Sequence, residues 1–143
     1  MGLLHLAQEA PEVSAETSVM DAVRTMTTRR VGAIAVVTGG RIVGVFTERD
    51  LMRRVVFERR DPETTLLRSV MSSPVQTVSD STSLTEAASL MRTHHIRHLV
   101  IVNDDGALLG MVGLRYLLYD LMDDLERKVD GLQSFIMADG PGG

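Results

Sequence analysis

Histidines are the side chains of this sequence that first suggest a chemical site. His94 and His95 are adjacent and His98 follows three residues later, and imidazole nitrogens are common metal ligands. The first two, however, are predicted to end a helix, whereas the third lies in a β-branched run typical of a strand. Since no pair at i and i+4 then faces one way, we predict no metal site. The chain has no cysteine, which excludes disulfides, thiolate nucleophiles and cysteine-based metal centres.

Two other patterns resemble chemical motifs but have structural explanations. Thr47 and Asp50 have the spacing of a helix capping box, in which a hydroxyl and a carboxylate each accept from a free amide. Gly39 and Gly40 lack the neighbours of a phosphate loop and indicate a hairpin turn. We find no nucleophile, base and orienting group at a recognisable spacing. We therefore expect the protein not to be an enzyme.

Length and composition describe one ordinary folded unit. The 143 residues are 44% hydrophobic, which is enough to bury a core of that size. A net charge of -4 and an aromatic content of 3% argue against a nucleic-acid surface. Apolar runs are far shorter than the roughly 20 residues needed to cross a bilayer, and the first residues do not resemble a secretion signal. We expect a cytoplasmic protein without nucleic-acid or membrane partners.

An internal repeat organises the chain. Residues 13–38 align without gaps with residues 78–103 at an offset of 65, and eight of the 26 pairs are identical, more than composition alone would give. One extra residue in the second turn shifts the offset to 66, after which Gly44 matches Gly110. The sequence therefore predicts two copies of one structural unit.

Each copy predicts the same order of elements. Capping boxes at Ser18 and Ser83 begin a helix, and apolar residues then recur at helical spacing. A β-hairpin follows, then a second helix that begins near Thr47 in the first copy and near Leu114 in the second. The expected strands are residues 12–14, 31–37 and 42–46, and residues 76–78, 96–102 and 108–112.

The expected fold is α/β, with two β-α-β-β-α repeats packed in pseudo-twofold symmetry and a C-terminal helix. About 60 residues are marginal for an independent core, so the copies should bury their faces against each other. We expect the first repeat with its N-terminal segment at 1–57, a linker at 58–70, the second repeat at 71–120, and a helical extension with a flexible tail at 121–143.

This pattern resembles a tandem pair of cystathionine-β-synthase (CBS) domains, a Bateman module. The resemblance is carried by Gly44-Val-Phe-Thr-Glu-Arg-Asp50, by Val70-Met-Ser-Ser-Pro-Val-Gln-Thr-Val78, by His95-Ile-Arg-His-Leu-Val-Ile-Val102 and by Val31-Gly-Ala-Ile-Ala-Val-Val37. It covers residues 12–120. It implies a stand-alone regulatory module whose inter-domain cleft binds an adenine nucleotide (AMP, ADP or ATP) as regulatory ligand, and whose occupancy is passed to a partner protein.

The same resemblance implies a set of ligand-binding residues. Asp50 would accept from the ribose diol, and Thr47 would face the ribose or phosphate. Arg97 and His98 would reach phosphates. The base would be lined by Gly32, Ala33 and Val45 from the first repeat, and by Met71, Gln76 and Thr77.

The second copy departs from the family pattern. Gly113 stands where the first copy has Thr47, and Tyr116 stands where it has Asp50. We therefore expect one competent site, and the sequence leaves open whether the second cleft holds another ligand or is filled by protein. It also leaves open S-adenosylmethionine as the ligand, and the alternative of an interaction module with empty clefts.

The C-terminal segment carries a heptad pattern. Six apolar residues are spaced 4, 3, 4, 3, 4: Leu118, Met122, Leu125, Val129, Leu132 and Ile136. We expect either a helix packed on its own module or a contact with a second copy or a regulated protein. A homodimer is the expected assembly, and residues 139–143 are expected to form a flexible tail.

Overall fold

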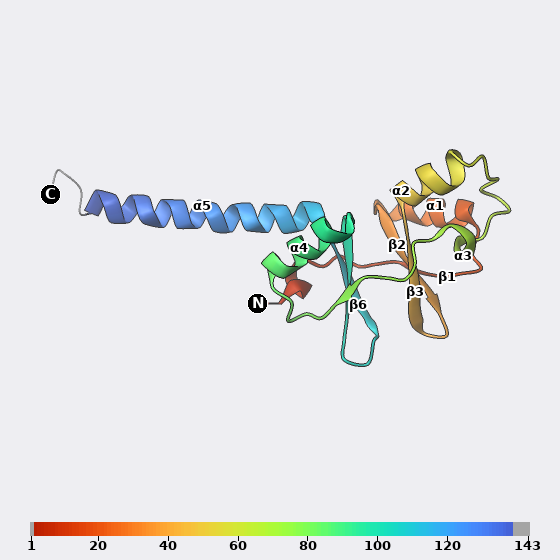
Figure 1. Ribbon diagram of the computed structural model, residues 1–143, viewed down its shortest axis with the longest axis horizontal. Helices are drawn as coiled ribbons and strands as arrows, with labels where there is room; N and C mark the ends of the chain where they lie inside the picture. The colour runs from red at the N-terminus through yellow and green to blue at the C-terminus, as the bar shows by residue number, and fades with distance from the viewer. Residues whose placement is uncertain (1, 139–143) are drawn as a thin grey trace.

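The structure, a computed structural model, describes residues 2–138 and the side chains of residues 2–133. Its elements repeat in the same order in the two halves (Figure 1). The first half contains η1 (Leu3–Leu6), β1 (Glu12–Ser14), α1 (Val19–Arg29), β2 (Ala33–Thr38), β3 (Arg41–Thr47), α2 (Glu48–Asp50) and the π-helical turns η2 (Leu51–Val56). The second contains α3 (Leu67–Val70), β4 (Thr77–Val78), α4 (Leu84–His94), β5 (His98–Val102), β6 (Leu108–Gly113) and α5 (Leu114–Ala138).

Two three-stranded sheets have the same topology. The order is β1-β2-β3 in one and β4-β5-β6 in the other, with a parallel first pair and an antiparallel second pair. The register shifts between Val36 and Val37 and between Ile101 and Val102, which are equivalent positions 65 residues apart. The α/β fold with two β-α-β-β-α repeats is confirmed.

The helix before each hairpin ends in a way that shortens the predicted strands. Arg30 and His95 adopt the left-handed conformation, with φ of 56° and 55°. The amide of Val31 then donates back to Met26 O, and that of Ile96 to Met91 O, both at 3.0 Å. Because residues 31 and 96 complete these helix ends, β2 and β5 begin two residues later than expected.

The predicted helix starts are in place, but only one of them is a full capping box. The Ser18 and Ser83 hydroxyls each accept from the amide three residues later, at 3.1 Å. The Asp21 carboxylate instead accepts from Arg24 Nη1 at 2.8 Å, so the reciprocal half predicted there is replaced by a local ion pair. Both halves of a box are formed at Thr47 and Asp50.

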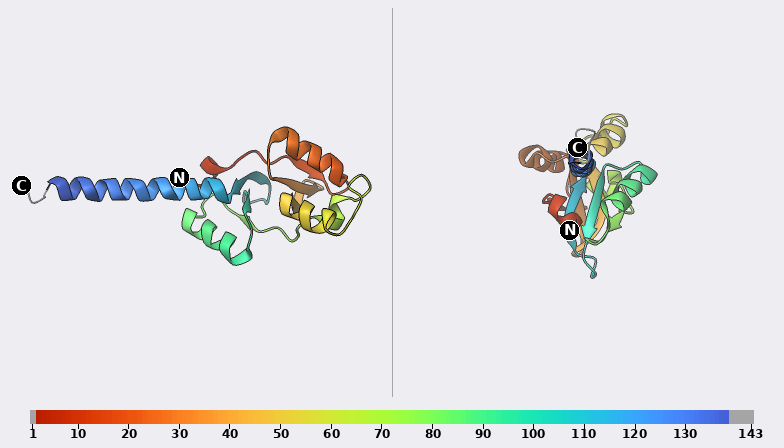
Figure 2. Two further views of the ribbon diagram at one scale, coloured as in Figure 1. Left: turned by 90° about the horizontal axis from the view of Figure 1, so that it is seen from above. Right: turned by 90° about the vertical axis from the view of Figure 1, so that its left-hand side faces the viewer.

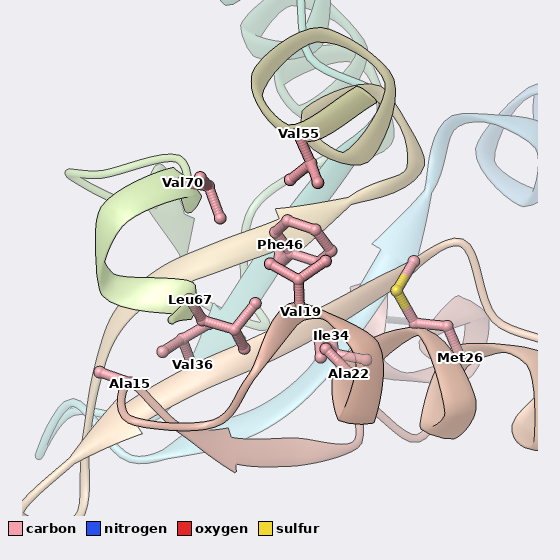
Figure 3. Packing of buried hydrophobic residues seen from close by; sticks show 10 residues of the cluster. All are labelled: Ala15, Val19, Ala22, Met26, Ile34, Val36, Phe46, Val55, Leu67 and Val70. Atoms are coloured by element: carbon pink, nitrogen blue, oxygen red, sulfur yellow. The ribbon is translucent and has the colours of Figure 1, made fainter. Parts of the chain in front are cut away.

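Buried side chains form one core in each repeat and a third between the sheets. Figure 3 shows the first core, in which α1, the strands, η2 and α3 surround Phe46. The second core contains Leu3, Val78, Ala87, Met91, Leu99, Ile101, Val112 and Leu117. The third contains Ala33, Ala35, Val100 and Met111, so the inner faces of the two sheets close over one apolar layer.

The segment that precedes each repeat packs on the other repeat. Leu3 of η1 is 1% exposed within the second core, and Leu67 of α3 is buried in the first. Backbone bridges accompany this exchange: Gln8 N donates to Met111 O at 2.8 Å, and Ser72 N to Val45 O at 2.8 Å. Each repeat therefore packs against a segment that lies outside its own predicted residue range. The predicted domain boundaries after residues 57, 70 and 120 remain predictions.

The second helix of the second repeat and the predicted C-terminal helix are one continuous element. Leu117 is buried in the second core, and from there α5 projects away from the body along its long axis (Figures 1 and 2). The flexible tail predicted for residues 139–143 lies outside the described residues. Within residues 2–138, no helix combines the length and apolar character that crossing a bilayer requires.

Candidate functional site

A cleft of about 1370 Å³ opens between the two repeats. Its walls come from β2, β3 and α2 on one side and from β5, β6 and the start of α5 on the other, with the segments at 8–10 and 72–76. Apolar side chains of the layer between the sheets reach its floor, including Ala33, Val45, Val100 and Met111. The cleft is thus built by both repeats, as the pseudo-symmetric packing requires.

The carboxylate of Asp50 is the most buried charged group of the first wall. The residue is 4% exposed. Its Oδ2 accepts from Thr47 N at 3.0 Å and from Thr47 Oγ1 at 3.2 Å. Its Oδ1 accepts from Ser72 Oγ at 2.8 Å and lies 3.7 Å from Arg54 Nε.

These contacts give Asp50 a structural role beside any role toward a ligand. It closes the start of α2 and ties the segment after α3 to the first repeat through Ser72. A carboxylate offers about four acceptor positions, so three hydrogen bonds leave it capacity for a ligand hydroxyl. Asp50 and Thr47 also line the cleft, and their contacts with a ligand remain predictions.

His98 lies in the second wall, where burial favours its neutral form. Burial lowers its pKa from the ordinary value of 6.5; the Glu48 carboxylate opposes this shift, and the Arg97 guanidinium adds to it. Glu48 comes from the first repeat, and its Oε1 lies 3.2 Å from the position that a Cβ would take at Gly32. The two repeats thus bring an acid, a histidine and an arginine together at this end of the cleft.

Cations outnumber anions among the charged residues of the walls. Four arginines line the cleft, at positions 30, 49, 97 and 115, against Glu9, Glu48 and Asp50. Arg49 also joins the repeats, because its Nη1 donates to His95 O at 2.9 Å. Such a surface suits an anionic ligand better than a cationic one.

Eight of the ten predicted site residues line the cleft: Gly32, Ala33, Val45, Thr47, Asp50, Gln76, Arg97 and His98. The other two lie elsewhere. Met71 packs against the first core, with its thioether beside Gly44. Thr77 is exposed on β4 and the next residue, Val78, is buried, as strand alternation requires.

Several residues that line the cleft were not predicted from the sequence. Ser72 and Val75 lie in the segment before β4, and their approach to the first repeat depends on the exchange of leading segments. Glu48 is the first residue of α2 and Arg115 is the second residue of α5. Apart from these positions at helix starts, nothing in the neighbouring sequence indicates that either residue lines a cleft. Gly113 and Tyr116, the equivalents of Thr47 and Asp50, do line the cleft opposite them.

The three histidines considered as metal ligands are separated as expected. His94 ends α4, His95 follows it in the left-handed conformation, and His98 begins β5. Among the residues that the structure describes, no group of three histidine or acidic side chains is close enough to hold a metal ion.

Two relatives match different shares of the chain. A protein of Methanopyrus kandleri is 41% identical over 76 residues, which cover 53% of this chain and 39% of that protein. The mitochondrial CBS domain-containing protein CBSX3 of Arabidopsis thaliana is 31% identical over 126 residues, or 85% of this chain and 61% of the relative. The chain thus spans 39% and 61% of the length of these two relatives.

Solved structures of similar chains have the same fold. A protein with CBS domains from Burkholderia ambifaria is 31% identical, with a TM-score of 0.76 over 83% of this chain and 86% of that one. A CBS domain protein from Pyrobaculum aerophilum, complexed with AMP, is 27% identical, with a TM-score of 0.74 over 86% and 99%. None of these four proteins is named as an enzyme.

The family described as CBS domain matches twice, at residues 7–56 and at residues 67–123. The two matches correspond to the two halves of the repeat and to the two walls of the cleft. The chain therefore belongs to the CBS-domain family, as a tandem pair with the architecture of a regulatory module.

Proposed function

We propose that the cleft binds an adenosine-containing nucleotide of the AMP, ADP or ATP class and that its occupancy regulates a partner protein. The observation that carries the proposal is the cleft itself, in which both repeats bring eight of the ten predicted residues together. The Pyrobaculum aerophilum relative, whose structure contains AMP, supports the choice of ligand.

The proposed ligand orientation follows from the chemistry of the walls. Asp50 and Thr47 would face the ribose, because the acceptor position that remains on the carboxylate can take a hydroxyl of the diol. Ala33 and Val45 offer the apolar contact that a base needs. Arg97 and neutral His98 would donate to phosphate oxygens. The excess of arginine favours a nucleotide over S-adenosylmethionine, whose sulfonium is cationic.

The signal would arise from the relative arrangement of the repeats. A ligand that touches both walls stabilises whichever arrangement it binds more tightly, and it can shift the equilibrium by no more than that difference in affinity. The regulated partner is part of the proposal, as is a cytoplasmic location.

Calorimetric titration of the full chain, stripped of copurified ligand, tests the proposal. We expect AMP, ADP or ATP to bind, and Asp50→Asn to weaken the dissociation constant roughly 10- to 100-fold, as for loss of a charge-assisted hydrogen bond. Asp21→Asn is the matched control, because Asp21 holds the equivalent place at an exposed helix start outside the cleft. Equal affinities for Asp50→Asn and the wild type would remove the ribose role.

A second candidate function is an interaction module whose cleft stays empty. The apolar stripe exposed along α5 favours it. Absence of binding heat with AMP, ADP, ATP and S-adenosylmethionine would support this alternative over the sensor.

A further inference from the structure

The apolar stripe of α5 is exposed over its whole described length. Leu125 is 61% exposed, Val129 50% and Leu132 62%, on a helix that extends from the body in both Figure 1 and Figure 2. We call the α5 seam the five residues Leu118, Met122, Leu125, Val129 and Leu132. The side chain of Ile136, the next member of the heptad pattern, lies outside the described residues.

The residue types of the seam select an occupant. In heptad terms Leu118, Leu125 and Leu132 are d positions, whereas Met122 and Val129 are a positions. Leucine at d with a β-branched residue at a favours two-stranded parallel pairing. We propose that α5 pairs with α5 of a second copy of this chain as a parallel two-stranded coiled coil. We infer this pairing without reference to a bound nucleotide; Leu118 and Met122 of the seam also border the cleft.

The charges beside the seam favour the parallel direction. Glu126 and Gln133 occupy e positions, whereas Leu121 and Lys128 occupy g positions. In a parallel pair each g residue faces an e residue of the next heptad, so Lys128 meets Gln133 of the second copy and no like charges meet. In an antiparallel pair that sets Leu125 opposite Val129, e positions lie beside e positions and g beside g, so Glu126 would lie beside Glu126 of the second copy and Lys128 beside its own equivalent.

The remaining charges lie away from the seam. Asp123, Asp124, Arg127 and Asp130 occupy the b, c and f positions, and Arg127 Nη2 donates to Asp124 Oδ1 at 2.7 Å. This outer face carries an excess of acid. It would repel an anionic membrane or nucleic acid, so the occupant of the seam is a protein.

Anchoring of α5 in the fold makes a short coiled coil workable. The seam spans 15 residues, or about 22 Å, which is short for a free coiled coil. Leu117 is buried in the second core and Leu114 packs against it, so the first turn of the helix is already formed. The packing of this first turn on the second repeat therefore offsets the free-energy cost of helix nucleation. Pairing has only to stabilise the later turns of α5.

Sedimentation of the full chain tests the pairing. We expect a dimer for the wild type and a dissociation constant raised roughly 100-fold or more by the double variant Leu125→Asp/Leu132→Asp, because the charges would enter an apolar seam. Both side chains are exposed, so the fold should be retained, as far-UV circular dichroism can verify. Arg127→Asp is the control, since it adds the same charge on the outer face. A monomeric wild type, or an undiminished dimer in the double variant, would overturn the proposal.

Direction can be read by cross-linking, because the chain has no native cysteine. In a parallel pair Leu132→Cys meets its own equivalent, so mild oxidation should give a covalent dimer from this single variant. In an antiparallel pair it would face Met122 of the second copy. A disulfide formed only in a mixture of Leu132→Cys with Met122→Cys would refute the parallel arrangement.

Discussion

Replacing Asp50 with alanine separates its structural role from any role toward a ligand. The carboxylate accepts hydrogen bonds from the Thr47 amide, the Thr47 hydroxyl and the Ser72 hydroxyl, at 3.0, 3.2 and 2.8 Å. It does so at a residue that is only 4% exposed. Asp50→Ala would therefore leave one amide and two hydroxyls without this acceptor.

The expected cost follows from the chemistry of those bonds. A hydrogen bond to a charged group contributes about 1.5–3 kcal/mol, and a buried donor left without an acceptor costs about 1–3 kcal/mol. Two of the three bonds join Asp50 to Thr47 and are not independent, so we expect Asp50→Ala to lower the free energy of unfolding by about 3–5 kcal/mol. Asp50→Asn keeps an acceptor for the Thr47 amide, and its cost should be about 1–2 kcal/mol.

Urea unfolding of ligand-free protein, followed by circular dichroism, measures these differences. Tyr116→Ala serves as the matched control, because Tyr116 is the equivalent position in the second repeat and is exposed rather than buried. It should cost less than about 1 kcal/mol. If Asp50→Ala cost no more than Tyr116→Ala, the hydrogen bonds of Asp50 would not stabilise the fold, and its burial would need another explanation.

Two further predictions concern His98 and Gly131. Because the folded-state pKa of His98 lies below 6.5, the unfolded chain takes up the proton first as pH falls, so stability decreases below that value and is unaffected above it. Urea unfolding at about pH 7.5 and about pH 5.5 should show a smaller loss for His98→Gln than for the wild type, and parallel losses would contradict this. Gly131→Ala should stabilise α5 by about 1 kcal/mol, since the added Cβ meets nothing within 4 Å. Its far-UV circular dichroism signal at helical wavelengths should rise, and a decrease would contradict the prediction.

Local patterns predicted most of the elements because each element of this fold carries its own signal. The Ser18 and Ser83 hydroxyls cap the helices that the apolar spacing indicated. The hairpins were predicted from β-branched runs on either side of a turn. Because the two halves align with each other, the elements predicted in one half could be compared with those predicted in the other. The errors at β2 and β5 arise because a left-handed residue at a helix end, Arg30 or His95, has no clear signature outside glycine.

The cleft was predicted only as far as the family motif reaches. Thr47, Asp50, Arg97 and His98 were found because motif positions carry them. Ser72 was missed because its hydrogen bond to Asp50 joins residues 22 positions apart, in a segment whose path depends on tertiary packing. The residues around Ser72 in the sequence do not indicate that its side chain reaches Asp50.

The exchange of leading segments places the backbone bridges inside the cleft. Gln8 and Met111, which form one bridge, and Val45 and Ser72, which form the other, all line it. A ligand that fills the cleft would therefore contact the residues that join the two repeats.

Met111, which bridges to Gln8 of the N-terminal segment, lies in β6. The helix α5 begins at Leu114, directly after that strand. A small movement of β6 would then be enlarged by the helix: a tilt of about 5° displaces the far end of a helix of about 37 Å by about 3 Å. Two such helices paired along the α5 seam would resist unequal tilts, because knobs-into-holes packing fixes their register. Occupancy of the cleft and pairing of α5 are thus expected to be linked whenever the empty and filled clefts favour different tilts, and by thermodynamic reciprocity pairing would alter ligand affinity by the same factor.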